Sequence, residues 1–308
     1  MILKCCPKLN SPIYYNSIAS QFLQRAIALC GLVMDINNST KGAKMKLYRK
    51  QEYQCGNYLE VNMFPVFSYS YASNGARKKK RKPTSKVQER LNQINAEREL
   101  VRLINTNFTN KDLKFELTYS PYNYPSSVEA AQKDIVNFLR RIKRYRKKCG
   151  LSEMKYVYSI EQGSKKRRLH FHVVMTGGID ITTIAKIWGK GYVDKVCPLL
   201  FSQTGCTGIG KYFCKQKITG KRWVSSRNCI KPVAKNTDGK ISKRKIKELS
   251  EECENRRMFE ALYPDYFYAV CKPFYNDING EYYLSLFMYK RKSEIDVFQS
   301  DDKLGEIT

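Results

Sequence analysis

Between residues 113 and 196, apolar and polar positions alternate with periods that predict a series of strands and helices. From Leu113 to Tyr119 every second residue is apolar, which is typical of a strand with one buried face. The capping box Ser126-Ser127-Val128-Glu129 then predicts the start of a helix that ends before Gly150. Further strands are expected at 155–161, 168–175 and 192–196, and a short helix at 181–188.

The order of these elements predicts the fold class. Strand, helix, strand, strand, helix, strand is the order of a ferredoxin-like or RRM-like antiparallel sheet with two helices on one face. The protein is therefore expected to be α+β, with this sheet as its core and with N- and C-terminal extensions. The long helix of the core is amphipathic, and its outer face is basic, with Arg140, Arg141, Lys143, Arg144, Lys147 and Lys148.

The flanking patterns divide the chain into three expected parts. The first part is an N-terminal extension, 1–110, with a helix at 18–33, a hairpin at 45–69, a basic run at 77–82 and a helix at 85–104. The second part is the core domain, 111–235. The third part is a C-terminal extension, 236–308, with a charged helix at 241–262 and a hairpin at 266–289.

The charge of the chain narrows the choice of partners. It contains 56 Lys and Arg against 28 Asp and Glu, a net charge of +28. This excess favours a polyanionic partner, with nucleic acid as the first candidate and an anionic membrane surface as the second. The run Arg77-Lys78-Lys79-Lys80-Arg81-Lys82 is expected to contact phosphates, although such runs are often only solvated.

Cysteine spacing and hydropathy indicate a soluble, intracellular protein. The eleven cysteines include no C-x-x-C pair, so a zinc ribbon or thioredoxin-like chemistry is not supported, and reduced thiols are expected. The fairly apolar segment 18–34 is interrupted by Gln21, Gln24 and Arg25, which makes it too polar and too short for a membrane span.

The two histidines of the chain, His170 and His172, stand two apart in one apolar strand. Residues i and i+2 of a strand point to the same face, so the two imidazoles are expected to lie side by side. Neutral imidazole is the commonest side-chain metal ligand, which predicts a two-histidine metal platform. The alternative is a half-buried strand that carries histidine at two solvent-facing positions.

Strand pairing adds carboxylates to the histidine face, because paired residues of an antiparallel hairpin point the same way. Glu161 is the candidate third ligand, and Gln162 is the alternative if the strand end is irregular; Glu116 and Thr118 fall on the same face as Glu161. Two imidazoles and one carboxylate suit Mg²⁺ or Mn²⁺ in phosphoryl chemistry, and they could also hold Zn²⁺ or Fe²⁺. On so basic a protein, the expected task is to polarise a scissile phosphate.

A candidate nucleophile follows the last strand of the core. A turn with Gly205, Gly208 and Gly210 is expected to open a short helix. Tyr212 and Lys215 stand three apart on it, hence on neighbouring parts of one face. A phenol with a pKa of about 10 needs a neutralised leaving oxygen, and Lys215 could add positive charge at the phosphate. Without the histidines, a surface Tyr and Lys on an ordinary amphipathic helix would be the simpler interpretation.

Three segments of the chain resemble the motifs of HUH endonucleases, in the order of that family. His170-Phe171-His172 is similar to the His-hydrophobic-His motif, and Ile209 to Lys215 resembles the later tyrosine motif. Phe115-Glu116-Leu117-Thr118 is similar, more loosely, to the upstream motif. The segments lie within 113–217, roughly a third of the chain. The resemblance is greatest to rolling-circle replication initiators of small phages and plasmids.

The resemblance implies the HUH endonuclease fold and strand-specific nicking of single-stranded DNA. Tyr212 would become linked to the 5′ phosphate and leave a free 3′-OH that primes synthesis, and a second transfer would rejoin the strand. Glu161 corresponds to the third ligand by its place nine residues before His170. Because Gly208 stands four residues before Tyr212, an arrangement with two tyrosines is not supported.

The implied partner is single-stranded DNA at a replication origin, in the cytoplasm of a bacterial host cell and without a membrane. No G-x-x-x-x-G-K-[ST] loop is present, so a separate helicase and polymerase are expected. A plasmid relaxase or a single-tyrosine transposase would use the same chemistry. A non-catalytic RRM-like binder is disfavoured because the aromatic residues of the central strands are expected to face the core. A DNA-condensing structural protein would explain the charge but not the His, Tyr and Lys residues.

Overall fold

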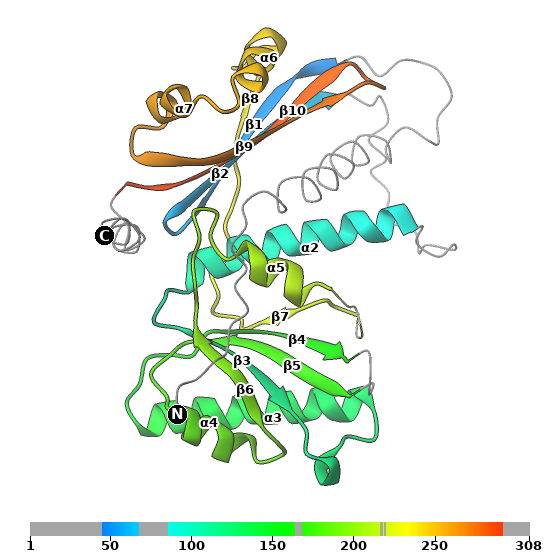
Figure 1. Ribbon diagram of the computed structural model, residues 1–308, viewed down its shortest axis with the longest axis vertical. Helices are drawn as coiled ribbons and strands as arrows, with labels where there is room; N and C mark the ends of the chain where they lie inside the picture. The colour runs from blue at the N-terminus through cyan, green and yellow to red at the C-terminus, as the bar shows by residue number, and fades with distance from the viewer. Residues whose placement is uncertain (1–44, 68–85, 164–167, 216–217, 219, 292–308) are drawn as a thin grey trace, which may run out of the picture.

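The computed structural model describes residues 45–67, 86–163, 168–215, 218 and 220–291. Within these residues the protein is α+β, with two antiparallel five-stranded sheets and six α-helices, so the expected fold class is confirmed (Figure 1). In this part of the chain, none of the helices combines the length and the apolar composition that a membrane span requires. The expected helix at 18–33 and the basic run at 77–82 lie outside the described residues.

The lower sheet of Figure 1 comes from the middle of the chain, in the strand order β6-β3-β5-β4-β7, with all neighbours antiparallel. With two helices between them, its first four strands complete the expected strand–helix–strand–strand–helix–strand unit of a ferredoxin-like sheet. The strands are β3 Leu113–Thr118, β4 Tyr156–Gln162, β5 Leu169–Met175, β6 Val193–Pro198 and the short edge strand β7 Val224–Ser225.

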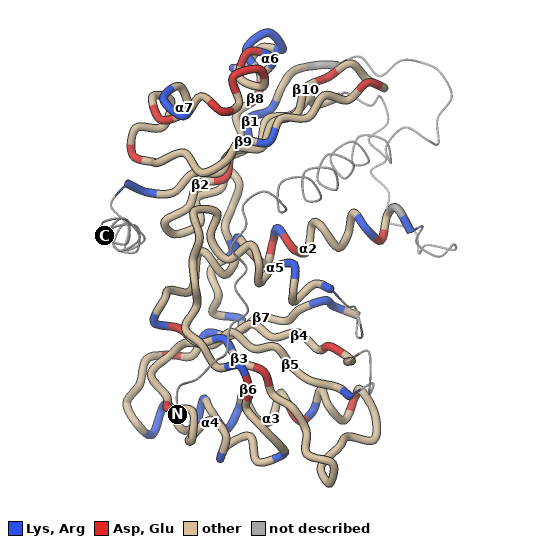
Figure 2. The backbone as a smooth tube through the Cα atoms, viewed as in Figure 1, with Lys and Arg blue, Asp and Glu red and all other residues tan. Residues whose placement is uncertain are grey.

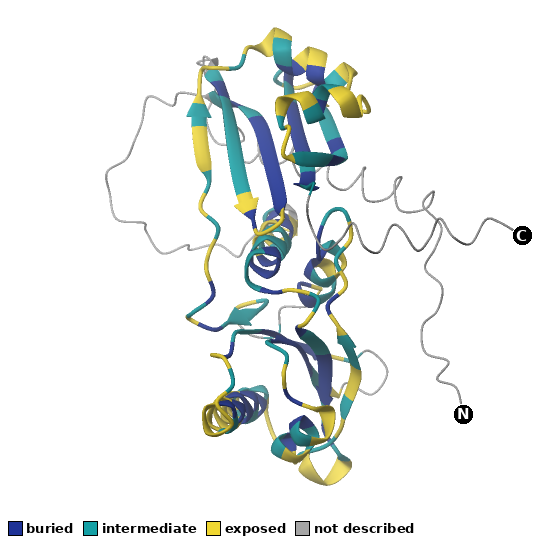
Figure 3. Ribbon diagram, turned by 90° about the vertical axis from the view of Figure 1, so that its left-hand side faces the viewer, coloured by how far each residue is buried: buried dark blue, intermediate teal, exposed yellow. Residues whose placement is uncertain are grey.

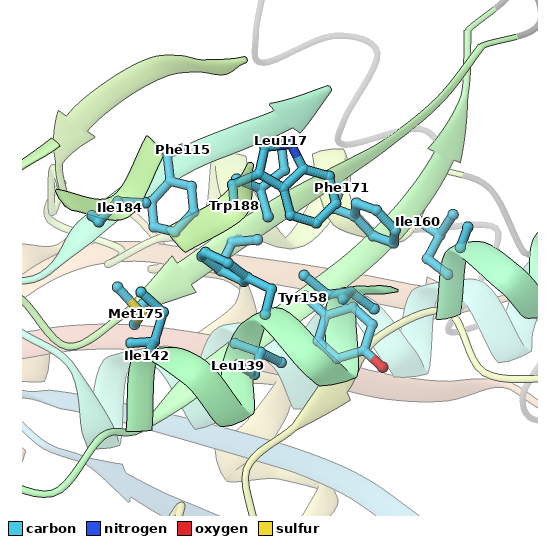
Figure 4. Close-up of a cluster of buried hydrophobic side chains, with 14 of the residues drawn as sticks. Phe115, Leu117, Leu139, Ile142, Tyr158, Ile160, Phe171, Met175, Ile184 and Trp188 are labelled. Carbon is cyan, nitrogen blue, oxygen red and sulfur yellow. The ribbon is translucent and has the colours of Figure 1, made fainter. Parts of the chain in front are cut away.

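One face of the lower sheet is covered by α3 (Val128–Lys148) and α4 (Ile181–Trp188). Ser127, inside the expected capping box, caps α3 by accepting a hydrogen bond from a first-turn amide at 3.2 Å. Figure 4 shows the hydrophobic cluster between sheet and helices, in which the fully buried Trp188 makes a T-shaped contact with Phe171. This core fixes the sheet and therefore the direction in which the opposite face points.

The upper sheet joins both extensions of the chain, in the strand order β8-β1-β2-β10-β9. The expected hairpins are confirmed, and they meet where β2 pairs with β10. The strands are β1 Met45–Cys55, β2 Tyr58–Phe67, β8 Lys235–Asp238, β9 Tyr266–Asn276 and β10 Glu281–Lys290.

Two helices, α6 (Lys243–Glu251) and α7 (Arg256–Leu262), cover the outer face of the upper sheet. The single helix expected at 241–262 is therefore wrong. Asn255 ends the first run and caps α7, since its side chain accepts a hydrogen bond from a backbone N–H at 3.2 Å. The break allows both short helices to bury apolar residues against one curved sheet.

Between the two sheets lie α2 (Lys86–Asn107) and the short α5 (Thr207–Phe213), as Figures 1 and 3 show from two directions. The first of these confirms the helix expected at 85–104. Gly56 turns the β1–β2 hairpin with φ +60°, and a Cβ there would come within 2.3 Å of the Asn105 carbonyl oxygen of α2. The hairpin thus packs directly on the helix.

A buried ion pair also ties α2 to the upper sheet. Arg102 donates two hydrogen bonds of 2.7 Å to the carboxylate of Glu60 on β2, and its guanidinium stacks on Tyr53 at 3.7 Å from the ring centroid. Burial alone would raise the pKa of Glu60, but Arg102 outweighs it and lowers that pKa. Glu60 therefore stays ionised in the interior only because Arg102 is present.

We predict that Arg102→Ala lowers the free energy of unfolding by about 3–5 kcal/mol in urea titrations, because it leaves a buried carboxylate without its partner. Arg49→Ala is the matched control. Arg49 makes the same two-point contact with Asp238, at 2.6 and 2.7 Å, but at the exposed surface, so its loss should cost about 1 kcal/mol or less. Equal losses in the two variants would contradict a structural role for the buried pair.

Candidate functional site

Strand pairing gathers the histidines and two carboxylates on one face of the lower sheet. On β5, His172 is paired with Glu116 of β3 and with Ser159 of β4, and His170 is paired with Glu161 of β4. Paired residues share a face. The expected company of the imidazoles is therefore confirmed, on the side of the sheet away from α3 and α4.

Glu161 lies against both imidazoles. Its Oε2 is 2.8 Å from Nε2 of His172 and 3.6 Å from Nε2 of His170. The three residues each offer a ligand atom within 4.8 Å of the others. Gln162, the alternative ligand, is paired with Leu169, a residue of the core on the opposite face, so strand alternation turns its side chain away.

The sequence predicts an open histidine face, but in the structure α2 and α5 cover it. Apolar residues of both helices pack on Val157 of β4 and Val174 of β5, beside the histidines. His172 is consequently fully buried, and only His170 keeps partial exposure. The expectation failed because α2 comes from the N-terminal extension, and its apolar stripe does not reveal which surface it will cover.

Close contact with α2 positions α5. The side-chain oxygen of Asn105 accepts a hydrogen bond from the Cys206 amide at 3.0 Å, one residue before α5 begins. Gly210 lies within α5, where a Cβ would come within 2.5 Å of a methyl group of Val101. Glycine therefore permits the helices to approach closely. Gly208 also lies inside the helix, so the expected glycine-rich turn is shorter than predicted.

Tyr212 points from α5 into the site. Its ring centroid is 4.4 Å from that of His172, and its hydroxyl donates a hydrogen bond of 3.0 Å to Oε1 of Glu116. Lys215 lies beyond the last helical residue and not on the face of the helix, as the sequence pattern predicted. Its ammonium nevertheless donates a hydrogen bond of 3.1 Å to Oε1 of Glu161. The structure thus brings all five predicted residues together.

Glu116 and Lys195 belong to the site, although the sequence assigned neither of them a role. Oε1 of the buried Glu116 accepts hydrogen bonds from Tyr212 and from Nζ of Lys195, the latter at 2.9 Å. Lys195 has φ 51°, in the left-handed region, where the pairing of β6 with β3 shifts register. Such an irregularity redirects a side chain. Strand alternation predicts the face of Glu116, but no sequence signal announces the shifted register at Lys195.

The electrostatics of the Tyr212–Glu116 pair favour a protonated phenol. Burial raises the pKa of Tyr212, and the neighbouring Glu116 carboxylate raises it further. Burial alone would raise the pKa of Glu116 too, but His172, Lys195 and Tyr212 outweigh burial and lower the pKa to about 2. At neutral pH the pair is a carboxylate that holds a neutral hydroxyl.

The three candidate ligands are in the electrostatic environment that metal binding requires. Burial and the nearby His172 lower the pKa of His170, which favours the neutral imidazole. Burial would raise the pKa of Glu161, but His172 and Lys215 reverse the effect and lower it. Nδ1 of His172 lies 3.4 Å from Glu116 and makes no hydrogen bond within the described residues. A carboxylate beyond a ligating imidazole is a common second partner in metal sites.

Comparison with known proteins agrees with the position of this site. Residues 114–217, about a third of the chain, match the family model described as replication-associated protein ORF2. The matched segment contains both histidines, Glu161, Tyr212 and Lys215. It supports a role as a replication initiator. No curated protein and no solved structure matches the chain significantly.

We predict that Glu161→Gln weakens Mn²⁺ binding by about 10-fold or more, since the anionic ligand is lost while its volume is kept. Isothermal titration calorimetry on the full chain measures the affinity. Gln162→Ala, one residue along the same strand, is the control and should leave it unchanged. The reverse ranking would make Gln162 the ligand.

A second prediction concerns the phenol. Glu116→Gln removes the anion that raises the pKa of Tyr212, so that pKa should fall. The measurement is an ultraviolet difference titration in EDTA, in which the curve of a Tyr212→Phe derivative is subtracted from that of its parent to isolate one tyrosine. An unchanged or higher pKa would show that the carboxylate does not govern the phenol.

Proposed function

We propose that this protein is a rolling-circle replication initiator that nicks single-stranded origin DNA through Tyr212 and later rejoins the strand. One observation carries the proposal: Tyr212 contacts His172 within the same site in which His170, His172 and Glu161 converge. A nucleophile and a metal-binding donor set side by side, on a chain of net charge +28, suit phosphodiester chemistry. The match to a replication-associated family points to the biological process.

The donor set fits a divalent cation such as Mg²⁺ or Mn²⁺. Two imidazoles and one carboxylate would hold it, and the buried, otherwise unbonded Nδ1 of His172 faces Glu116, which would orient the ring. The chemistry that such a cation supplies when bound is polarisation of the scissile phosphate and stabilisation of the leaving oxygen.

The residues of the chain divide the remaining work. Tyr212 Oη forms the bond to phosphorus, and the bond from phosphorus to the 3′ oxygen breaks. The hydroxyl proton leaves toward Glu116, the nearest acceptor at 3.0 Å, and the 3′ oxygen takes up a proton to become the 3′-OH. Lys215, whose side chain is 63 % exposed, can turn from Glu161 to the incoming phosphate. Rejoining reverses these bonds: a 3′-OH attacks the phosphotyrosine, and Tyr212 is released.

We further propose that the protein acts in the cytoplasm of a bacterial host with a separate helicase and polymerase. A plasmid relaxase or a single-tyrosine transposase remains the alternative of equal chemistry, and the replication-associated family favours the initiator. A non-catalytic RRM-like binder finds less support, because α2 and α5 occupy the sheet face on which bases would stack.

The deciding experiment incubates the full chain with a pool of random-sequence single-stranded DNA and Mn²⁺. A covalent protein–DNA adduct should form, and Tyr212→Phe should abolish it, because phenylalanine has no oxygen to attack phosphorus. Denaturing gels detect the adduct, and peptide mass spectrometry locates it.

Tyr275→Phe is the matched control, since Tyr275 is an exposed tyrosine of the upper sheet, and it should retain the adduct. An adduct that survives Tyr212→Phe would assign the nucleophile elsewhere. Absence of any adduct from the unsubstituted protein would reject the enzymatic proposal.

A further inference from the structure

A second basic surface lies on the other side of the lower sheet, away from Tyr212. The second half of α3 and the segment after it border an open groove with a volume of about 730 Å³. In Figure 1, α3 lies below this sheet and α5 above it, so the sheet separates the groove from the candidate site. Its lining residues are Arg140, Lys143, Arg144, Arg146, Lys147, Leu151, Ser152, Glu153 and Met154.

The cations of this groove stand on a rigid wall. Arg146 is only 2 % exposed, and its guanidinium donates hydrogen bonds to the carbonyl oxygens of Ser152, Thr176 and Gly177 at 2.9, 3.2 and 2.7 Å. It thereby joins α3 to the segment after it and to the end of β5. Arg146 is structural, and the groove that it shapes keeps its form without a ligand.

The exposed cations of the groove lack partners for most of their charge. Arg140, Arg144 and Lys147 are spaced by three or four residues along one side of α3, and within the described chain none of them makes an ion pair. Lys143 is 3.8 Å from Glu153, the only acidic residue of the lining. Figure 2 marks basic positions along α3 in blue, and Figure 3 shows the outward surface of the helix exposed.

This arrangement selects a class of ligand. A row of guanidinium and ammonium groups recognises phosphates. Single-stranded nucleic acid also requires aromatic platforms for its bases, and no lining residue is aromatic. Tyr145, on the same helix, packs against the core cluster instead. Contact with a membrane would need exposed apolar side chains beside the cations, and the groove offers only the half-buried Leu151 and the buried Met154.

The basic surface continues beyond the groove toward the β7 edge of the sheet. Asn228 donates a hydrogen bond of 3.2 Å to the carbonyl oxygen of Met154, which holds the 226–231 loop against the end of the groove. Arg227 and Lys231 are exposed on that loop. A phosphate backbone in the groove would therefore find further cations on its way around the edge.

We propose that the α3 groove binds the phosphate backbone of double-stranded DNA, as a contact separate from the site of Tyr212. That this duplex adjoins the nicked single strand rests on the proposed function; the duplex-binding groove itself does not. Charge without base-stacking groups makes this contact independent of base sequence. It would hold origin DNA while the opposite face of the sheet acts on the exposed strand.

The test compares two triple variants in a Tyr212→Phe background. Arg140→Gln/Arg144→Gln/Lys147→Gln removes three groove charges and leaves Arg146 in place. Arg244→Gln/Lys245→Gln/Lys247→Gln on α6 removes three charges from the upper layer and is the matched control. Fluorescence anisotropy over a range of salt concentrations measures binding to a random-sequence duplex, to random-sequence single-stranded DNA and to anionic phospholipid vesicles.

The groove variant should weaken duplex binding and reduce the salt-dependence slope by about 2.7, the value for three lost phosphate contacts, with single-stranded binding unchanged. The α6 variant should keep the slope. Equal losses in both variants, a loss confined to single-stranded DNA, or a loss confined to vesicles would overturn the proposal. Normal duplex behaviour with no Tyr212 adduct in the unsubstituted protein would reject the nicking function and leave this inference standing.

Discussion

The close packing of α5 on α2 is the contact on which the geometry of the site depends. A side chain at Gly210 would meet Val101, so the two backbones approach only because glycine stands there. The same α2 is joined to the upper sheet by Arg102 and Glu60. The distance between Tyr212 on α5 and His172 on β5 is therefore determined by three layers of the molecule, and the extensions are part of the site's support.

Charge in the site is arranged in pairs, with carboxylates inside and lysines at the rim. Lys195 bonds to Glu116 and Lys215 to Glu161, with lysine side chains 65 % and 63 % exposed and carboxylates 6 % and 11 % exposed. Exposed lysines exchange partners at little cost, whereas buried carboxylates cannot leave. An arriving phosphate therefore competes for the lysines, and the carboxylates remain as the fixed frame around Tyr212 and the imidazoles.

Local patterns were sufficient for the central sheet and for most of the site. Strand alternation predicted that Glu161 shares a face with His170 and His172, because side-chain direction in a strand depends only on parity. It could not predict that α2 covers that face, since an apolar stripe does not specify its partner. The break at Asn255 and the shifted register at Lys195 also escaped, because each depends on tertiary packing that overrides the local pattern. The ligand, nucleophile and lysine assignments remain hypotheses that the geometry supports.

The joining of both extensions in one sheet has a consequence for the order in which the molecule folds. The lower sheet uses strands from Leu113 to Ser225, which are near one another along the chain. The upper sheet needs β10 beside β2, and Tyr48 donates a hydrogen bond to Glu281 across 233 residues. Distant contacts of this kind slow folding, and chains emerge from the ribosome N-terminus first. The β1–β2 hairpin must therefore wait for the last strands, and the upper layer closes only after the histidine-bearing sheet can already have formed.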